Sequence, residues 1–582
     1  MHLAQLNILN FRKLARAEIC FQPGLNVLVG ANNAGKTAVI DALRSLLAGH
    51  DEPFPRLETV DIHCPKGGKP SGDITFHYIF TGLDADDEAD FMAALKEDAH
   101  GEMAVHITIR YSDADKAGRL RAKRWCGEHE ELGLTSDMME NLRGVYLQPL
   151  RDASQSLRPS RTSQLARLFH LLADDLGRDG INAALKTLDD ELKKQKPIIS
   201  ADDAIKARHS SMLGPQLAQS LELGLSGTDV QRLAARISLI VDTFEIEQNG
   251  LGFNNLIFMA VVLSELTKNP EANYRGLIIE EPEAHLHPQL QAVLLSYLET
   301  IKAVEGEKPV QLFVTSHSPN FASIADLDSL TCLVDTGTNV ETFSPRTITF
   351  EKGKREKLER YLDVTRAELF FARRIIFVEG AAELMLVSVL AQKAGFKLRE
   401  HGVSLISVEG LNFDSFLPLF GAKALKIPVA LLTDADPVDE PAVGRDPQAI
   451  YPAIGDIVKV SDNTAKMKKS EDAFVNVFYG LKTLEYDLAL HEENRTIMLS
   501  ALKDLHPRIG LAVEGKVKAA VGDAAKARAL FSGMFERPES NVQKGRFAQV
   551  LAQLISDGAD CKVPNYIVNA IKHVCAPIAV KP

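Results

Sequence analysis

The chain has 582 residues, more than one hydrophobic core usually holds, and this length predicts about three or four domains. An apolar content of 45%, a charged content of 25% and a mean hydropathy of -0.06 exclude wholesale disorder and a fibrous protein, and no apolar run is long enough to cross a membrane. The net charge of -12 excludes a protein that coats DNA through overall positive charge, although a local basic groove or metal-binding carboxylates remain compatible with a nucleic-acid partner.

The first residues, Met1 to Arg12, alternate polar and apolar as a strand does, unlike a secretory signal peptide. The six cysteines lie far apart and form no C-x-x-C pair, which argues against a disulfide framework or a structural zinc site. We therefore expect a cytoplasmic protein with no membrane partner.

Residues 30–37, with the sequence G-A-N-N-A-G-K-T, match the whole G-x-x-x-x-G-K-[ST] pattern between a strand at 25–29 and a helix that begins near Lys36. Glycines at these positions let backbone N–H groups surround phosphates, and the helix N-terminus adds partial positive charge. Lys36 would reach the β- and γ-phosphates and Thr37 would bind Mg²⁺. The residues expected to bind ATP here are Gly30, Asn33, Gly35, Lys36 and Thr37.

Short strands and polar turns follow as far as residue 150, and between 160 and 240 leucines recur at three- and four-residue steps typical of helices. These apolar stripes need a partner surface. The pattern fits the core of an ordinary helical subdomain or a helical arm used for dimerisation, and the residues alone leave both open.

An apolar strand at 277–279 ends in two acids, as a Walker B element requires. Glu280 takes the place of the usual aspartate beside the metal, and Glu281 is the candidate base that orients water. The next strand ends in His317, a position that matches the switch histidine of ABC-type ATPases. Gln148, after a strand at 145–147, is the candidate Q-loop residue, although Pro149 makes the local geometry unusual.

Together with Asn10-Phe11-Arg12, these motifs resemble the SMC/RecF/Rad50 branch of ABC ATPases, which also needs a signature loop at the start of the helix before Walker B. Residues 225–229 look more like the familiar L-S-G-G letters, but residues 249–255, which include Gly252, lead directly into that helix. Position favours the second segment. The resemblance implies nucleotide held between two copies of the chain, hence at least a dimer.

A second α/β unit places acids at the ends of two apolar strands. Glu379 follows the strand 375–378 and is joined by Glu383, while Asp434 and Asp436 follow the strand 429–432. This pattern resembles the TOPRIM domain, in which carboxylates hold divalent metals against a phosphodiester, since Mg²⁺ prefers hard oxygen ligands. The similar V-E-G segment that contains Glu409 is either a plain β–α turn or part of the site.

An ABC-type ATPase followed by a TOPRIM domain resembles the OLD (overcoming lysogenization defect) family of endonucleases along the whole chain. Residues 146–153 are similar to the family's Y-L-x-x-L-R-D-A segment, with Gln148 a departure that puts nucleotide sensing there in doubt. Taken by themselves, the T-L-E-Y-D-L segment at 483–488 and the cluster at 543–549 are typical of caps or exposed helix faces. The resemblance instead implies that Glu485, with Asp487 as a further candidate, binds the second metal and that Lys544 stabilises the scissile phosphate.

The predicted fold class is α/β: an SMC/RecF/Rad50-like ATPase domain with a helical dimerisation insertion, then a TOPRIM domain and a helical C-terminal region. The expected limits are 1–155 and 241–350 for the two ATPase parts, 156–240 for the insertion, 351–371 for a linker, 372–490 for TOPRIM and 491–582 for the C-terminal region.

The predicted function is ATP-regulated cleavage or nicking of DNA with two Mg²⁺ or Mn²⁺ ions in the nuclease site and one ion with ATP, in anti-phage defence. Catalytic roles are expected for Glu379, Lys544 and Glu281. Gabija-type relatives act beside a UvrD-like helicase, so such a partner is a further possibility. Two basic clusters are candidates for gripping DNA, although each is more typical of a solvated face: Lys466, Lys468 and Lys469, and Arg373 with Arg374.

A rival hypothesis is a nucleotide-switched DNA-binding or repair clamp with a silent TOPRIM scaffold, and the retained acids count against it. A primase or topoisomerase is a third hypothesis. A topoisomerase needs a nucleophilic tyrosine, but Tyr479 and Tyr486 are predicted in apolar helical context and the helical tail offers no obvious one. The signature helix and switch histidine disfavour a small-molecule kinase.

Overall fold

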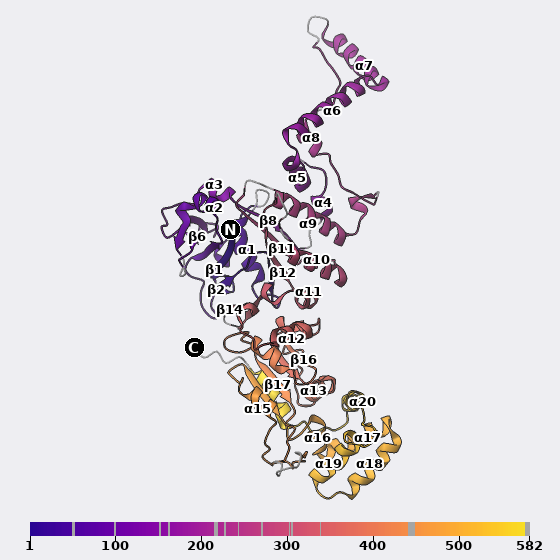
Figure 1. Cartoon of the computed structure of the whole chain (residues 1–582). Helices are drawn as coiled ribbons and strands as arrows, with labels where there is room; N and C mark the ends of the chain where they lie inside the picture. The colour runs from indigo at the N-terminus through magenta and orange to yellow at the C-terminus, as the bar shows by residue number, and fades with distance from the viewer. Residues whose placement is uncertain are drawn as a thin grey trace.

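The computed structural model shows an elongated molecule in which an N-terminal α/β body carries a protruding helical arm and is followed by a second α/β body and a helical bundle (Figure 1). The residues described are 1–48, 53–97, 101–149, 153–160, 163–214, 219–225, 229–242, 244–268, 272–301, 303, 307–337, 339–439 and 448–576. No helix among them is both long and apolar enough for a membrane crossing.

The N-terminal body contains two sheets that enclose one core. The antiparallel sheet has the order β2-β1-β4-β6-β5, with β7 paired to β6. Its strands are β1 (His2–Phe11), β2 (Leu14–Cys20), β4 (Ile74–Thr81), β5 (Leu95–Glu97), β6 (Met103–Ser112) and β7 (Arg121–Cys126). Alternating residues of β4 are buried, as expected for a sheet with one face on the core.

The second sheet, of order β14-β13-β3-β12-β11-β8, is parallel except for β14. Its strands are β3 (Leu25–Val29), β8 (Leu142–Leu147), β11 (Tyr274–Glu280), β12 (Gln311–Ser316), β13 (Leu330–Asp335) and β14 (Val340–Phe343). Every residue of β3, β11 and β12 is buried, since central parallel strands are covered on both faces. Helix α1 (Lys36–Leu47) shares a core with both sheets, and Gly144 of β8 lets it approach closely, because a Cβ there would lie 1.9 Å from the carbonyl oxygen of Leu47.

The arm is built from α5 (Gln164–Leu172), α6 (Asp175–Lys193), α7 (Lys196–Leu213) and α8 (Val230–Ala234), and α5 packs on α9 (Leu251–Lys268) at its base. No residue of α6 or α7 is buried. Several of their apolar side chains are instead exposed, including Leu176 at 84% and Met212 at 76%.

The remaining elements of the N-terminal half are short or peripheral. They are η1 (Thr59–Asp61), α2 (Ala85–Asp90), η2 (Met92–Ala94), α3 (Ser136–Glu140), α4 (Ala153–Ser156), β9 (Ile240–Val241), β10 (Phe244–Glu245), η3 (Ile246–Gln248), α10 (Pro288–Thr300), α11 (Pro319–Ile324), η4 (Leu327–Ser329) and η5 (Pro345–Thr347).

The second body has a parallel sheet of order β16-β15-β17-β18, with β15 (Arg374–Val378), β16 (Val403–Ser407), β17 (Val429–Thr433) and β18 (Val475–Tyr479). The linker before it contains α12 (Lys354–Tyr361) and η6 (Ala367–Phe370). The helices that follow β15 and β16 are α13 (Ala381–Lys393), α14 (Phe413–Phe416) and η7 (Leu417–Leu419), with α15 (Asp462–Lys468) before β18. The prediction that Tyr479 lies in a helix is wrong, because it ends β18, a strand that pairs with β17.

The C-terminal helices pack against this sheet rather than forming a detached tail. They are α16 (Leu484–Ala489), α17 (Glu492–Leu505), α18 (Pro507–Ala519), α19 (Asp523–Phe535), α20 (Lys544–Ser556) and α21 (Asn565–Cys575). One core joins Ile376, Leu386, Met498, Leu551 and Ile571. The predicted α/β fold class, with a helical insertion in the first body and a helical C-terminal region, is confirmed.

Candidate functional site

The phosphate-binding loop lies between β3 and α1, where three residues have positive φ: Gly30 at 150°, Asn33 at 66° and Gly35 at 95°. A side chain at Gly30 would collide with the backbone, because a Cβ there would lie 2.5 Å from the carbonyl oxygen of Leu333. Glycine is therefore required at this turn by sterics. Thr37, at the start of α1, is exposed.

Lys36 is buried beneath this loop. Its Nζ donates to the carbonyl oxygens of Gly30 at 2.6 Å and Ala31 at 3.1 Å and lies 3.2 Å from Nδ1 of His317. Burial lowers the pKa of Lys36 to about 8, although Glu281 and Glu283 partly offset it. The lysine predicted to hold phosphate and the predicted switch histidine therefore meet at one point.

The two predicted Walker B acids diverge from the end of β11. Glu280 accepts a hydrogen bond from the Tyr146 hydroxyl at 2.6 Å, and burial raises the pKa of its carboxyl. Glu281 has a φ of 47°, and its Oε1 lies 3.2 Å from Nε2 of His317. A cleft of about 400 Å³ is lined by Asn32, Asn33, Glu281 and His317. The acid expected to orient water thus faces the cleft, while its neighbour points toward β8.

Glu283 has a structural role that the sequence did not predict. Its Oε1 accepts from the backbone N–H of His317 and from the Ser316 hydroxyl, each at 2.8 Å. It fixes the end of β12 and so orients the histidine. The E-E-P-E motif at residues 280–283 is the sequence signal that could have indicated a role for Glu283.

Gln148 is exposed one residue beyond β8, which pairs with β11, so it lies at the same sheet edge as Glu280. Gly252 lies in the first turn of α9, where a Cβ would be 2.6 Å from the carbonyl oxygen of His285 in the loop after β11. The rival signature segment lies on the arm, where the N–H of Leu225 donates to Asp189 at 2.6 Å, and its residues 226–228 fall outside the described ranges. Residues 150–152, part of the Y-L-x-x-L-R-D-A segment, also lie outside them.

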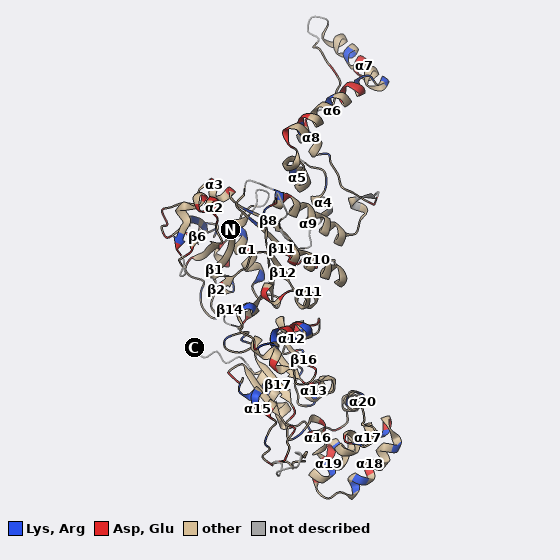
Figure 2. Cartoon of the chain, viewed as in Figure 1, with Lys and Arg blue, Asp and Glu red and all other residues tan. Residues whose placement is uncertain are grey.

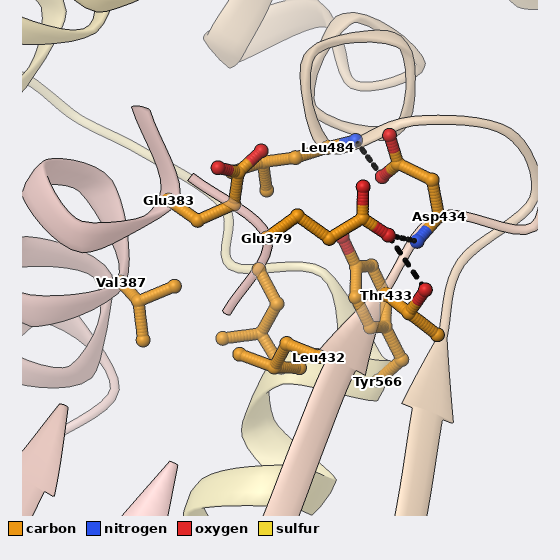
Figure 3. A pocket seen from close by; sticks show the side chains of 9 residues that line it. Glu379, Glu383, Val387, Leu432, Thr433, Asp434, Leu484 and Tyr566 are labelled. Carbon is orange, nitrogen blue, oxygen red and sulfur yellow. Dashed lines mark hydrogen bonds between the residues drawn. The ribbon is translucent and has the colours of Figure 1, made fainter. Parts of the chain in front are cut away.

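The second site forms where neighbouring strands β15 and β17 end (Figure 3). Glu379 directly follows β15, and its Oε1 accepts from the Thr433 hydroxyl at 2.6 Å and from the N–H of Asp434 at 2.9 Å. Asp434 in turn accepts from the N–H of Leu484 at 3.3 Å. Glu379 and Asp434 are therefore joined by a hydrogen bond, and a second bond joins Asp434 to the start of α16.

Three helices bring the remaining charges. Glu383 lies in the first turn of α13, Glu485 in α16 and Lys544 at the start of α20. Lys544 Nζ lies 3.0 Å from Glu485 Oε2, which also accepts from the Thr483 hydroxyl at 3.0 Å. Thr483 caps α16, and Gln543, Lys544, Arg546 and Gln549 are exposed, as expected. The expectation of a cap or an exposed face is wrong for the rest of the segment 483–488, because every residue of α16 is buried and Lys544 reaches Glu485 there.

The negative charges of this site are incompletely neutralised. Burial raises the pKa of Asp434 well above its usual value, and repulsion from Glu379 and Glu485 adds to the effect. Burial and repulsion from Glu485 likewise raise the pKa of Glu383. For Lys544, burial alone would lower the pKa, but attraction by Glu485 and Asp434 outweighs it and the pKa is raised. Among the described residues, Lys544 acts on Glu383, Asp434 and Glu485, and Lys482 acts on Asp436, so the carboxylates outnumber the ammonium groups and the site favours a further cation.

A divalent metal fits these residues by the chemistry of the donors, which are all hard carboxylate oxygens. The Oε1 of Glu485 is buried and has no hydrogen-bond partner, as a metal-binding oxygen would. Within the described ranges, no group of three or more His, Cys, Asp or Glu side chains is arranged so that it could hold a metal ion as it stands. The acids instead border a small cavity of about 10 Å³ and bond to protein donors.

Two further candidates do not join this cavity. The side chain of Asp487 turns away from it to accept from the N–H groups of Leu481, at 3.1 Å, and Lys482, at 3.3 Å. Asp487 therefore stabilises the loop after β18 and is not placed to bind the second metal. Asp436, with a φ of 38°, is exposed and does not line the cavity, but its carboxylate interacts electrostatically with Lys482, Lys544 and Glu485, so it remains a candidate ligand beside the cavity.

The candidate DNA-gripping clusters are largely engaged in contacts within the chain. Lys468 donates to the Tyr479 hydroxyl at 3.0 Å, and Lys466 lies 3.7 Å from Glu351. Arg374 donates to the carbonyl oxygen of Val574 at 2.7 Å and so anchors α21. Figure 2 shows blue residues on α15 and mixed signs on α12.

Tyr566, from α21, lines the carboxylate cavity and was not expected there, since the helical tail offered no obvious candidate for a nucleophilic tyrosine (Figure 3). Burial and the surrounding acids raise its pKa well above the usual value, so the phenol is un-ionised at neutral pH. We expect Tyr566→Phe to lower the rate of phosphodiester cleavage about 10-fold, the effect of losing one hydrogen bond that the hydroxyl would donate to a bound phosphate. Thermal unfolding should stay unchanged. A cleavage rate equal to that of the wild type would show that the hydroxyl serves packing only.

Together, the two sites define an ABC-type ATPase joined to a TOPRIM domain. The AAA ATPase domain family matches residues 1–223 and 145–322, more than half of the chain, and the TOPRIM domain of the overcoming lysogenization defect protein-like family matches residues 370–436. The chain belongs to the AAA ATPase domain family, and its residues 370–436 match the OLD-like TOPRIM domain.

Individual relatives agree with this assignment. The chain is similar to the OLD nuclease of Thermus scotoductus, with 25% identity over 468 residues, 76% of this chain and 83% of that protein. It is 24% identical over 293 residues to the endonuclease GajA of Bacillus cereus, but this match covers 44% of the chain and 41% of GajA. A solved C-terminal region of the Xanthomonas campestris pv. campestris OLD protein is 29% identical, covering 36% of this chain and 98% of that one, with a TM-score of 0.25.

Proposed function

We propose that the chain is a DNA endonuclease that uses two Mg²⁺ or Mn²⁺ ions and is regulated by its ABC-type ATPase. The observation that carries this proposal is the meeting of four acidic side chains and one lysine from five separate elements at the carboxyl ends of β15 and β17. The residues proposed to hold the ions are Glu379, Glu383, Asp434, Asp436 and Glu485. When bound, such ions activate water and stabilise the leaving oxygen of a phosphodiester.

The protein's own side chains prepare this chemistry. The bonds from Thr433 and the Asp434 N–H fix the orientation of the Glu379 carboxylate before substrate arrives. The ammonium group of Lys544 pairs with Glu485 and can pair instead with a phosphate oxygen of a bound substrate. This arrangement supports catalytic roles for Glu379 and Lys544.

For the ATPase, we propose that Lys36 and the loop glycines bind the phosphates, that Thr37 and Glu280 hold one Mg²⁺, and that Glu281 orients water under the control of His317. Gln148 would sense the nucleotide and Gly252 would contact a second copy of the chain. By similarity to GajA, we propose a role in anti-phage defence, with a UvrD-like helicase as a candidate partner.

The arm supports a homodimer, because its exposed apolar residues lie along helices with no buried face. We expect the double variant Leu176→Asp, Leu188→Asp to be monomeric in light scattering, while the wild type is at least a dimer. Lys186→Asp, on the same helix, introduces the same side chain at a polar position and should leave the mass unchanged. A dimeric double variant would rule out this face as the interface.

A plasmid assay with purified wild type and Glu379→Ala tests the proposed function. Both proteins are incubated with Mg²⁺ or Mn²⁺, with and without ATP, and the plasmid forms are separated by electrophoresis. Nicking or linearisation by the wild type alone is expected. If neither protein cleaves while both hydrolyse ATP, the proposal fails in favour of a nucleotide-switched clamp.

A further inference from the structure

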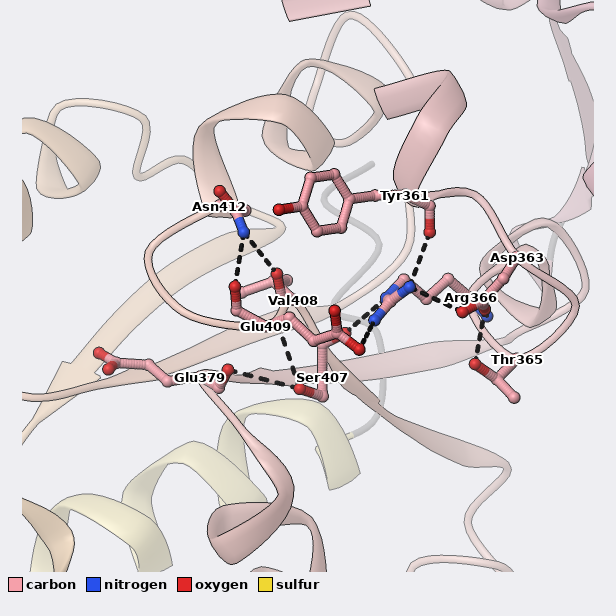
Figure 4. Close-up of polar contacts among 9 residues, drawn as sticks. All are labelled: Tyr361, Asp363, Thr365, Arg366, Glu379, Ser407, Val408, Glu409 and Asn412. Atoms are coloured by element: carbon pink, nitrogen blue, oxygen red, sulfur yellow. Dashed lines mark hydrogen bonds and ion pairs between the residues drawn. The ribbon is translucent and has the colours of Figure 1, made fainter. Parts of the chain in front are cut away.

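Arg366, on the linker between the two bodies, is a buried cation with four polar contacts (Figure 4). Its Nε donates to the carbonyl oxygen of Ser407 at 2.9 Å, and its Nη1 donates to Tyr361 O at 2.9 Å and Asp363 Oδ2 at 2.7 Å. Its Nη2 lies 2.5 Å from Glu409 Oε1. One guanidinium therefore joins the linker to the end of β16.

The segment that Arg366 holds is bonded directly to the peptide of Glu379. The N–H of Gly410 donates to the Glu379 carbonyl oxygen at 2.7 Å, and the Ser407 hydroxyl donates to the same oxygen at 3.4 Å. Glu409 has a φ of 52°, a sharp turn that the Arg366 ion pair helps to maintain. The question left open by the sequence is thus answered: Glu409 is not in the carboxylate cavity, and its side chain binds the linker.

The other side of the linker packs against the ATPase. Helix α11 begins two residues after His317 and packs on η6, the short helix that Arg366 precedes. Phe321 of α11, Leu369 of η6 and Phe377 of β15 belong to one continuous core. At the first turn of α12, Arg355 pairs with Asp328 at 2.9 Å, while Lys354 pairs with Asp414 beyond β16. The linker therefore contacts both α11, which follows His317, and the segment bonded to Glu379.

We infer that Arg366 is a positioning residue that transmits the nucleotide state at His317 to the loop carrying Glu379. This inference rests on the proposed function. A packed core shifts as a unit instead of deforming locally, so a displacement of α11 moves η6 and Arg366 with it. The guanidinium fork is needed because its rigid donors hold two carbonyl oxygens and two carboxylates at once, which a lysine ammonium does not.

The test compares plasmid cleavage with and without ATP for the wild type, Arg366→Lys and Glu409→Gln. Glu409 is largely exposed, so its substitution removes the ion pair without disturbing a core. Lys397→Gln is the matched control, because it removes an exposed ion pair with Glu400 in the same domain. ATP hydrolysis, Mn²⁺ binding by calorimetry and thermal unfolding are measured in parallel.

We expect both variants to bring the ratio of cleavage with and without ATP to about 1, the value for uncoupled sites. Cleavage should fall about 10- to 100-fold as Glu379 loses its placement, whereas ATP hydrolysis, the unfolding midpoint of Glu409→Gln and the Lys397→Gln control stay as in the wild type. If folded Arg366→Lys and Glu409→Gln keep the wild-type ratio of cleavage with and without ATP, the inference about Arg366 is overturned, whereas the proposed function is not. Absence of cleavage by the wild type would overturn the proposed function and this inference with it.

Discussion

Replacing Asp434 with asparagine is expected to abolish DNA cleavage and to make the metal-free protein more stable. Cleavage should fall at least about 10³-fold, because the loss of a metal-binding carboxylate removes several kcal/mol of charge stabilisation. Stability should rise, because burial and repulsion from Glu379 and Glu485 already disfavour the ionised Asp434 side chain. Asparagine keeps the size of the residue and the acceptor for the Leu484 N–H.

Cleavage rates and thermal unfolding midpoints without metal measure the two effects. Asp504→Asn, at an exposed position of α17, makes the same chemical change away from the site and should alter neither quantity. A lower midpoint for Asp434→Asn would contradict the charge repulsion described above. An unchanged cleavage rate would remove Asp434 from the nuclease site.

Lys36→Ala is expected to lower ATP hydrolysis at least about 10³-fold, because the substitution removes the ammonium group at the centre of the phosphate loop. The fold should persist. The pKa of Lys36 is about 8 in the folded chain and near 10.5 when unfolded. The unfolded state therefore binds more protons between these values, so the wild type should gain stability relative to the variant as pH rises from about 8 to about 10.5.

Phosphate release assays and thermal unfolding at pH 7 to 10.5 check both expectations. Lys13→Ala removes an exposed lysine that pairs with Asp335 in the same domain and should keep wild-type ATP hydrolysis. Substantial hydrolysis by Lys36→Ala would show that the nucleotide binds elsewhere.

The features predictable from the sequence are those that neighbouring residues determine. The phosphate loop, the acids after β11 and the acid after β15 each follow an apolar strand directly, and parallel strands end at one edge of a sheet. This rule alone places Glu379 beside Asp434. The helices of the arm were equally predictable, because the three- and four-residue spacing of apolar residues depends only on neighbouring positions.

Features that depend on packing between distant segments were not predictable from the residues alone, and only the family resemblance indicated site roles for Lys544 and Glu485. Lys544 and Glu485 are 59 residues apart and meet only because α20 packs on α13 and α17. Tyr566 enters the cavity from the last described helix, and Asp487 turns toward its own loop because Gly480 leaves room for its carboxylate. The linker's charged sequence gave no sign that Arg366 would be buried, since two of its four partners come from β16 and the turn after it.

The central claim is that one chain carries two chemically separate sites, and the most direct test measures both activities of Glu379→Ala in the same reaction. ATP hydrolysis and plasmid cleavage are followed together in Mg²⁺, with the fold verified by thermal unfolding. The account predicts that cleavage disappears while ATP hydrolysis continues largely as in the wild type. Equal loss of both activities in a folded protein would contradict it.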